Sequence, residues 1–258
     1  MFILYLLLLA GMPSGTAPGV SSGDWQIEHY RWSGSIAEGR AIDIRNNHGD
    51  IRCRFSDSEE VLVSAVIQRH SDDPRRAEMA IEESKDGLTI AVLYPPVDDP
   101  GASEVTPEME RRRVDLTALI PAGSRLTAGT IKGLIEAKGL ESDVEASSLS
   151  GNIVLATTGL VHARTEHGRI DAVLESDTWQ GRPTLETVTG DITLFLPPST
   201  DATIRAETRG LITTDYSIEI SQEAAIGPKQ AVARIGEGHL ELAITSSKGN
   251  IRILKSGF

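Results

Sequence analysis

The chain has 258 residues, and 25 Lys and Arg against 37 Asp and Glu give it a formal net charge of −12. With 40% hydrophobic residues it is too apolar for wholesale disorder, and its acidic balance disfavours general nucleic-acid binding, because phosphate backbones attract positive fields. The single cysteine excludes an intrachain disulfide framework and any multi-cysteine metal cluster. The unusual feature is 24 glycines beside only 4% aromatic residues, which indicates a core of small aliphatic side chains.

The N-terminus predicts export. Met1–Ala10 is an unbroken apolar run, too short to span a bilayer but typical of the hydrophobic part of a signal peptide. We therefore expect residues 1–19 to be a signal peptide and residues 20–41 to be a linker or lead-in. The mature chain would then carry no transmembrane span and would reach the periplasm, the cell surface or the medium. A buried N-terminal strand is the alternative interpretation of the apolar run.

The next segments predict strands and one long loop. Hydrophobic residues alternate in Val61–Ile67 and in Leu88–Val92, which is typical of strands with one buried face. Between them, Pro74–Lys85 fits either a short helix or a strand. Residues 95–113 are rich in proline and charge and lack periodicity, so we predict a flexible loop there.

The most informative pattern is the triplet Gly-x-Ile, which occurs nine times. From Gly129 the intervals to the next three aligned glycines are 22, 17 and 22 residues, a period typical of strand-repeat architectures. A polar residue precedes most of these glycines, as expected for tight turns. The 39 residues between the last two Gly-x-Ile triplets fit two repeats. We predict repeat turns at Gly49, Gly129, Gly151, Gly168, Gly190, Gly210, Gly238 and Gly249.

Each of these glycines is followed by residues that alternate as a strand with one buried face. After Gly190, for example, Ile192, Leu194 and Leu196 share a face. One such unit cannot bury its apolar face alone, whereas units stacked at about 4.8 Å join these faces into one core. We therefore predict an all-β fold, a β-solenoid or single-stranded β-helix-like stack of short strands with glycine-marked turns. A narrow core of this kind leaves little room for aromatic rings.

The segments IDIRNNHGDIRC, LETVTGDITLFLPPST and SSKGNIRI carry a family resemblance. They look like the repeats of the bacterial putative-adhesin family, a β-strand-repeat domain of unknown function, and the resemblance covers residues 42–254. It implies a non-enzymatic cell-envelope or surface module that binds or acts as a scaffold. The partner that it implies is an unknown glycan or an envelope or surface protein. The family has no established catalytic residues to transfer, and an accessory or sensor role in envelope stress is a further alternative.

The sequence offers little catalytic chemistry. It has no Walker A, GxGxxG, HExxH or EF-hand motif, so we expect no catalytic, cofactor or metal site. The best enzymatic alternative is a polysaccharide-active β-helix, because glycoside hydrolysis typically needs two carboxyl groups about 5–10 Å apart. Adjacent repeats would supply two candidate pairs, Asp171 with Asp191 and Glu145 with Glu166.

Polar residues next to the glycines predict structure at the turns. Four of them directly follow a repeat glycine and predict a polar ladder along one edge: Asp50, Asn152, Asp191 and Asn250. The histidines do not predict a metal site, because the 17-residue interval stacks His167 over Ser150 and not over another histidine. A terminal unit after Ile253 would leave an open sheet end and favour end-to-end self-association.

Overall fold

The computed structural model describes residues 17–22, 24–37, 39–95, 109–222 and 227–257. These residues form strands and one short 3₁₀ helix, η1 (Met109–Arg111), so the predicted all-β class is confirmed. Most of the predicted signal peptide and of the predicted loop at 95–113 lies outside the described residues. Among the described residues, no helix has the length and apolar character needed to cross a membrane.

The strands form two sheets of 11 strands each. Sheet A has the order β1 (Ala17–Ser22), β2 (Trp25–Ser35), β5 (Glu60–His70), β8 (Arg112–Pro121), β4 (Ile51–Ser56), β10 (Ile135–Leu140), β12 (Ile153–Thr157), β14 (Ile170–Leu174), β16 (Ile192–Leu196), β22 (Ile251–Lys255) and β18 (Ile212–Thr214). Sheet B has the order β19 (Ile218–Gln222), β20 (Lys229–Ile235), β17 (Ala202–Thr208), β21 (Leu240–Lys248), β15 (Thr184–Thr189), β13 (Val161–His167), β11 (Asp143–Ser150), β9 (Arg125–Lys132), β3 (Ala41–His48), β7 (Gly87–Leu93) and β6 (Glu78–Glu83).

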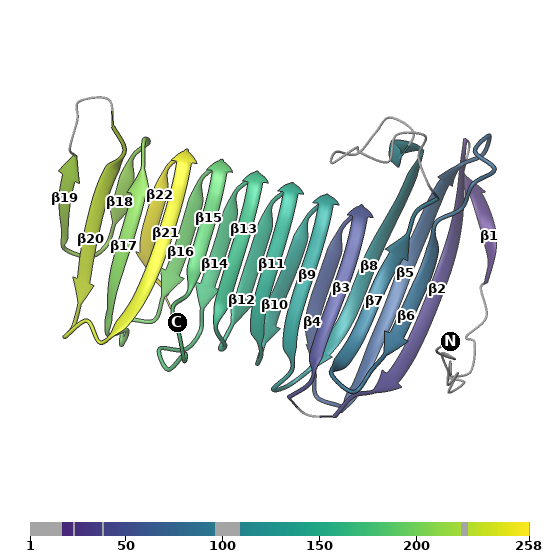
Figure 1. Cartoon of the computed structure of the whole chain (residues 1–258), viewed down its shortest axis with the longest axis horizontal. Helices are drawn as coiled ribbons and strands as arrows, with labels where there is room; N and C mark the ends of the chain where they lie inside the picture. Colours follow the sequence, from purple (N-terminus) through teal and green to yellow (C-terminus); the bar gives the residue numbers. More distant parts are fainter. Residues whose placement is uncertain (1–16, 23, 38, 96–108, 223–226, 258) are drawn as a thin grey trace, which may run out of the picture.

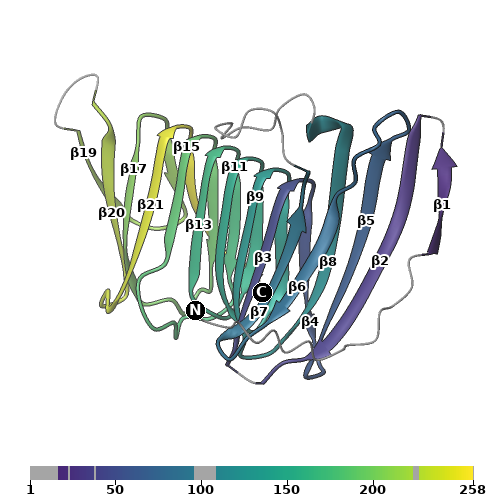
Figure 2. The same ribbon diagram turned by 45° about the vertical axis from the view of Figure 1, so that its right-hand side comes forward.

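From β9 to β16 the chain alternates between the two sheets, and neighbouring strands within each sheet are parallel. A strand of sheet B, a glycine turn and the following strand of sheet A make one rung. The rungs stack side by side along the long axis, with β1 and β19 at opposite ends (Figure 1, Figure 2). The finer assignment to a β-solenoid or single-stranded β-helix stays a prediction.

The core lies between the two sheets and consists mainly of small aliphatic side chains. Ile192, Leu194 and Leu196 of β16 are fully buried, as predicted from their alternation. Within the described part of the chain, Trp179 is the one aromatic side chain in the buried core. Tyr30 and Tyr216 are partly buried against it and come from strands or turns near the two ends of the stack. Trp179 itself lies in the connection between β14 and β15, so the buried side chains that the described strands contribute to the core include no ring.

Seven glycines line the edge at which the chain crosses from sheet B to sheet A. A Cβ on Gly168 would lie 2.0 Å from the carbonyl oxygen of Gly151, and one on Gly190 would lie 1.9 Å from that of Gly168. Heavy atoms cannot approach so closely, so a side chain would force the rungs apart. In spatial order this glycine ladder is Gly49, Gly133, Gly151, Gly168, Gly190, Gly249 and Gly210.

Side chains on both sides of the glycine bond to the neighbouring rung. Three residues before it, the hydroxyl of Thr165 donates to the carbonyl oxygen of Gly151 at 3.0 Å, and equivalent bonds follow from Thr187 and Ser246. One residue after it, Asp191 accepts the backbone N–H of Asn250 at 2.8 Å. The predicted polar ladder is confirmed, since Asp50, Asn152 and Asn250 each accept a neighbouring N–H in the same way.

Two of the predicted repeat turns are wrong. Gly129 lies within β9, and Gly133, four residues later, occupies the turn. Both glycines are followed by x-Ile, so the triplet alone does not separate them, whereas Thr130 three residues before Gly133 supplies the hydroxyl that the ladder uses. Gly238 lies in the turn between β20 and β21 with φ of 76°, outside the glycine ladder.

The C-terminal rung is not at the end of the stack. β21 pairs with β15 and β17, and β22 pairs with β16 and β18. The rung of Gly249 is therefore inserted between those of Gly190 and Gly210, and the expected open unit after Ile253 is wrong. Beyond it, antiparallel β20 and β19 extend sheet B.

The N-terminal part contributes more sheet than the sequence predicted. Residues 20–41, expected as a lead-in, include β2, which pairs antiparallel with β5 along its whole 11-residue length. Of the two possibilities for Pro74–Lys85, the strand is correct, because β6 pairs antiparallel with β7.

The glycine ladder predicts a sharp difference between two glycine-to-alanine variants. Gly168→Ala places a Cβ against a backbone carbonyl and should lower the free energy of unfolding by about 3 kcal/mol. Gly129→Ala is the matched control, since its nearest contact is Ser147 Oγ at 3.4 Å, and it should stay within about 1 kcal/mol of the parent. Urea unfolding followed by circular dichroism measures both, and equal losses would contradict the ladder.

Cys53, the only cysteine in the chain, provides a second test. It is fully buried in β4, and burial raises the pKa of its thiol to about 12. Because the thiolate is the reactive form, iodoacetamide at pH 8 should label the native protein only as fast as the stack opens. Gly133→Ala, whose Cβ would lie 2.0 Å from Gly49 O, should accelerate labelling more than Gly210→Ala at the far end. Mass spectrometry gives the rates, and rapid labelling of the native parent would refute the sealed core.

Candidate functional site

The outward face of sheet B presents side chains in straight rows that run across the strands. One row joins Thr127, Glu145, His162, Thr184, Ala243 and Arg205 on successive strands from β9 to β17. The next row joins Gly129, Ser147, Arg164, Glu186, Thr245 and Glu207 on the same strands. Neighbouring strands lie about 4.8 Å apart, so each row offers one side chain per strand at nearly constant spacing.

Two hollows lie on this face. The first hollow has a volume of about 270 Å³, lies over β11, β13 and β15, and is lined by Glu145, Ser147, His162, Arg164, Thr184 and Glu186. His162 Nδ1 is hydrogen-bonded to Thr184 Oγ1 at 2.8 Å, and Arg164 lies 3.7 Å from Glu186. The lining therefore holds two carboxylates against one guanidinium, together with neutral hydroxyl and imidazole groups.

The second hollow lies on the same rows, two to three strands further along, which corresponds to about 10–14 Å. Its volume is about 270 Å³, and it is lined by Arg182, Arg205, Glu207, Gln230, Val232, Ala243 and Thr245. Gln230 Nε2 donates to Glu207 Oε2 at 3.3 Å. This lining holds two guanidinium groups against one carboxylate, the reverse of the first hollow.

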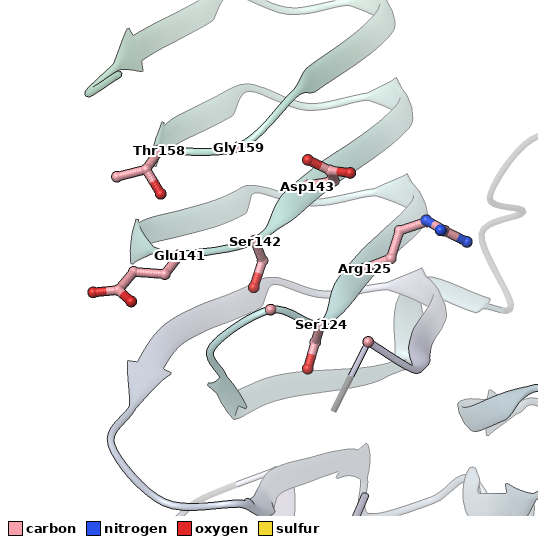
Figure 3. Close-up of a pocket in the computed structure, with 9 residues that line it drawn as sticks. Ser124, Arg125, Glu141, Ser142, Asp143, Thr158 and Gly159 are labelled. Atoms are coloured by element: carbon pink, nitrogen blue, oxygen red, sulfur yellow. The ribbon is translucent and has the colours of Figure 1, made fainter. Parts of the chain in front are cut away.

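A third pocket lies at the edge opposite the glycine ladder, where strands of sheet A turn into sheet B (Figure 3). Arg125 and Asp143 point to one side of it, and Glu141 and Thr158 point to the other (Figure 3). Asp143 Oδ1 also accepts the backbone N–H of Leu160 at 2.8 Å. Because its charged groups diverge and one of them already stabilises a turn, this pocket has no convergent binding groups.

The candidate carboxylate pairs, Asp171 with Asp191 and Glu145 with Glu166, are not in register. Asp171 lies beside Thr193 in the neighbouring rung, and Glu145 lies beside His162. Asp191 instead bonds within the glycine ladder. Glu166 lies four residues beyond His162, about 13 Å along the strand and too far from Glu145. Asp191, in contrast, lies two residues from Thr193 and stays diagonal to Asp171. The enzymatic alternative therefore loses one of its two pairs.

The described histidines show no metal-binding arrangement. His167 is in register with Ser150, as predicted, and His48 Nδ1 is hydrogen-bonded to the Arg112 carbonyl oxygen at 2.8 Å. Within the described ranges, no group of three or more His, Cys, Asp or Glu side chains is placed to hold a metal ion.

Sequence reasoning missed the second hollow. Arg182 precedes β15 and Arg205 lies on β17, and the inserted strand β21 lies between these two strands and contributes Ala243 and Thr245 to the lining. The usable signal was weaker: an outward small residue, such as Ala243, flanked by long polar side chains on the adjoining strands.

No family model matches the chain, and no curated protein matches it. Among solved structures, it is similar to a putative cell adhesion protein from Clostridium sporogenes, with 10% identity and a TM-score of 0.48 over 88% of this chain and 100% of that one. It is also similar to a putative adhesin from Bacteroides fragilis, with 10% identity and a TM-score of 0.30 over 87% and 96%. A putative adhesin from Parabacteroides merdae gives 12% identity and a TM-score of 0.30 over 87% and 95%. These likenesses are partial, so the function proposed below rests on this chain's own residues.

Proposed function

We propose that the protein is an exported, non-enzymatic binding module of the cell envelope or surface, and that it binds an extended glycan along the outward face of sheet B. The observation that carries the proposal is the pair of hollows on the same two rows of polar side chains. A chain that runs along the long axis would contact both.

The face is built to bind through side chains. Backbone N–H and C=O groups within a sheet are already paired, so a ligand lying across sheet B meets side chains, among them hydroxyl, carboxylate, guanidinium and imidazole groups. Extended peptides gain much of their affinity from backbone bonds at a sheet edge, which this face does not offer. Sugar hydroxyls both donate and accept hydrogen bonds, so they suit a lining that mixes Glu145, Ser147 and Arg164.

Rigidity favours the same function. The glycine ladder and its side-chain bonds fix the spacing of the rungs, so the rows are arranged before a ligand arrives. A preorganised surface loses little conformational freedom on binding, and weak contacts along it then add up.

The remaining parts of the proposal come from the sequence. Export rests on the apolar leader, and membership of the putative-adhesin family and a solenoid-like winding rest on the Gly-x-Ile repeats. End-to-end self-association would have to use the β18 and β19 end, because β6, at the other end of sheet B, carries Glu78, Glu82 and Glu83, and charged edge strands resist pairing.

Filling the first hollow tests the proposal. Ser147→Trp should block it and weaken binding to a glycan about 10-fold or more, whereas Thr117→Trp, at an exposed position on the outward face of sheet A, should leave binding unchanged. Binding is measured by calorimetry with the ligands that a glycan array identifies.

Two results would overturn the proposal. The first is a failure to find the expected site: the folded protein binds no glycan on the array, or Thr117→Trp abolishes binding and Ser147→Trp does not. The other is release of reducing ends from a bound polysaccharide that is lost in Glu145→Gln, which would make the protein an enzyme.

A further inference from the structure

We infer that the second hollow is an anion subsite that binds the carboxylate of a uronic acid unit in a glycan whose neighbouring units are uncharged. The inference rests on the proposed function and names its ligand class. Its basis is the placement of Arg182 and Arg205 in one hollow.

The two guanidinium groups are available to a ligand. Both residues are exposed, and within the part of the chain that the structure describes neither side chain has an ion pair or hydrogen bond. Several other arginines on the outward faces are paired: Arg45 with Asp43, Arg164 with Glu186 and Arg169 with Asp171. Glu207, the one carboxylate in the second hollow, is bonded to Gln230. In a chain with 37 acidic residues, two neighbouring arginines without an acidic partner are a distinctive feature.

The chemistry of the arginine pair selects a planar anion. A guanidinium presents parallel N–H donors that match the two oxygens of a carboxylate, and such charge-assisted bonds are stronger than neutral ones. Gln230 and Thr245 add neutral hydrogen-bonding groups to the lining, while Ala243 and Val232 keep part of the floor low and apolar. These surroundings fit a sugar ring that carries one carboxylate.

The first hollow limits the charge density of the ligand. Glu145 and Glu186 line it, with Arg164 as the only guanidinium, so an anionic group placed there would be repelled. The hollows are about 10–14 Å apart, a separation comparable to the repeat of a disaccharide. The same chain therefore contacts both hollows favourably when uronate and uncharged sugars alternate. Densely sulfated polymers and phosphate-bearing polymers do not meet this condition.

The probe is hyaluronate oligosaccharides, in which uronate alternates with an uncharged N-acetylated amino sugar. They should bind the parent protein, with an affinity that falls as sodium chloride is raised. The double variant Arg182→Gln/Arg205→Gln should lose about 10- to 100-fold in affinity, as expected for removing charge-assisted hydrogen bonds. Arg252→Gln, which removes an equally unpaired and exposed arginine from the outward face of sheet A, is the control and should bind as the parent does.

Equal urea midpoints for the variants and the parent will show that the fold is kept. The inference fails if the parent does not bind hyaluronate, or if the double variant binds it unchanged. It also fails if heparin or a phosphate-bearing polymer binds more tightly than hyaluronate through the same arginines, since the anion would then not be an isolated carboxylate. If neutral dextran binds and Ser147→Trp blocks it while the double arginine variant has no effect on hyaluronate, the glycan-binding function stands and only the uronate subsite is lost.

Discussion

The structure depends on one steric constraint, the contact between backbones at the glycine ladder. At each turn the position of a missing Cβ lies about 2 Å from a carbonyl oxygen of the neighbouring rung, as between Gly190 and Gly168. No residue with a side chain fits there at the observed spacing. The hydroxyl and Asx bonds to the same turns then fix the register, because each joins a set position before or after one glycine to the next. Spacing and register are therefore both decided at the edge of the stack.

Because of this constraint, the sequence determines directly which side chains lie next to one another on the outer faces of the sheets. Once each rung is in register, outward residues at equivalent positions fall into rows. A substitution at one outward position then changes one side chain in one row and leaves the positions of the others unchanged. The hollows arise where such a row holds Ser147 or Ala243 between longer side chains. A binding surface of this kind needs no loop closure and no catalytic geometry. It depends only on which side chains the rows carry and on how the rungs are ordered.

The sequence predicted what local pattern determines. The alternation of Ile192, Leu194 and Leu196 and the polar residues after the glycines both report on immediate neighbours, and both are confirmed. The choice between Gly129 and Gly133 failed because a glycine followed by x-Ile is only part of the repeat. Most ladder glycines also have Ser or Thr three residues before them, and at Thr165 and Thr187 this hydroxyl bonds to the neighbouring rung.

The local sequence pattern did not predict the order in which the rungs stack. The insertion of β21 and β22 between strands that precede them in the chain is a choice between two sets of compatible neighbours, because the rungs carry similar ladder groups: Thr208 bonds to the Gly249 carbonyl oxygen much as Ser246 bonds to that of Gly190. Periodicity cannot distinguish such neighbours, because the motif that specifies stacking is common to all of them. The second hollow depends on this insertion for part of its lining, because Ala243 and Thr245 lie on β21 between β15 and β17, so the complete lining could not be assembled from the order of the strands in the sequence. Features of the face that lie within one run of consecutive rungs, such as the first hollow, follow from spacing alone.

The net charge of −12 and an anion subsite are compatible on electrostatic grounds. At physiological ionic strength, charges further than about 8 Å apart are largely screened, so the acidic surface as a whole acts weakly on a carboxylate held at the second hollow. Contacts with Arg182 and Arg205 act at hydrogen-bond distance and remain effective. A nucleic acid differs because its affinity comes from many phosphate contacts in succession, each of which would need its own cation along the face. The rows instead hold a few charged groups of both signs among neutral residues, which suits a ligand with sparse charge and disfavours one with dense charge.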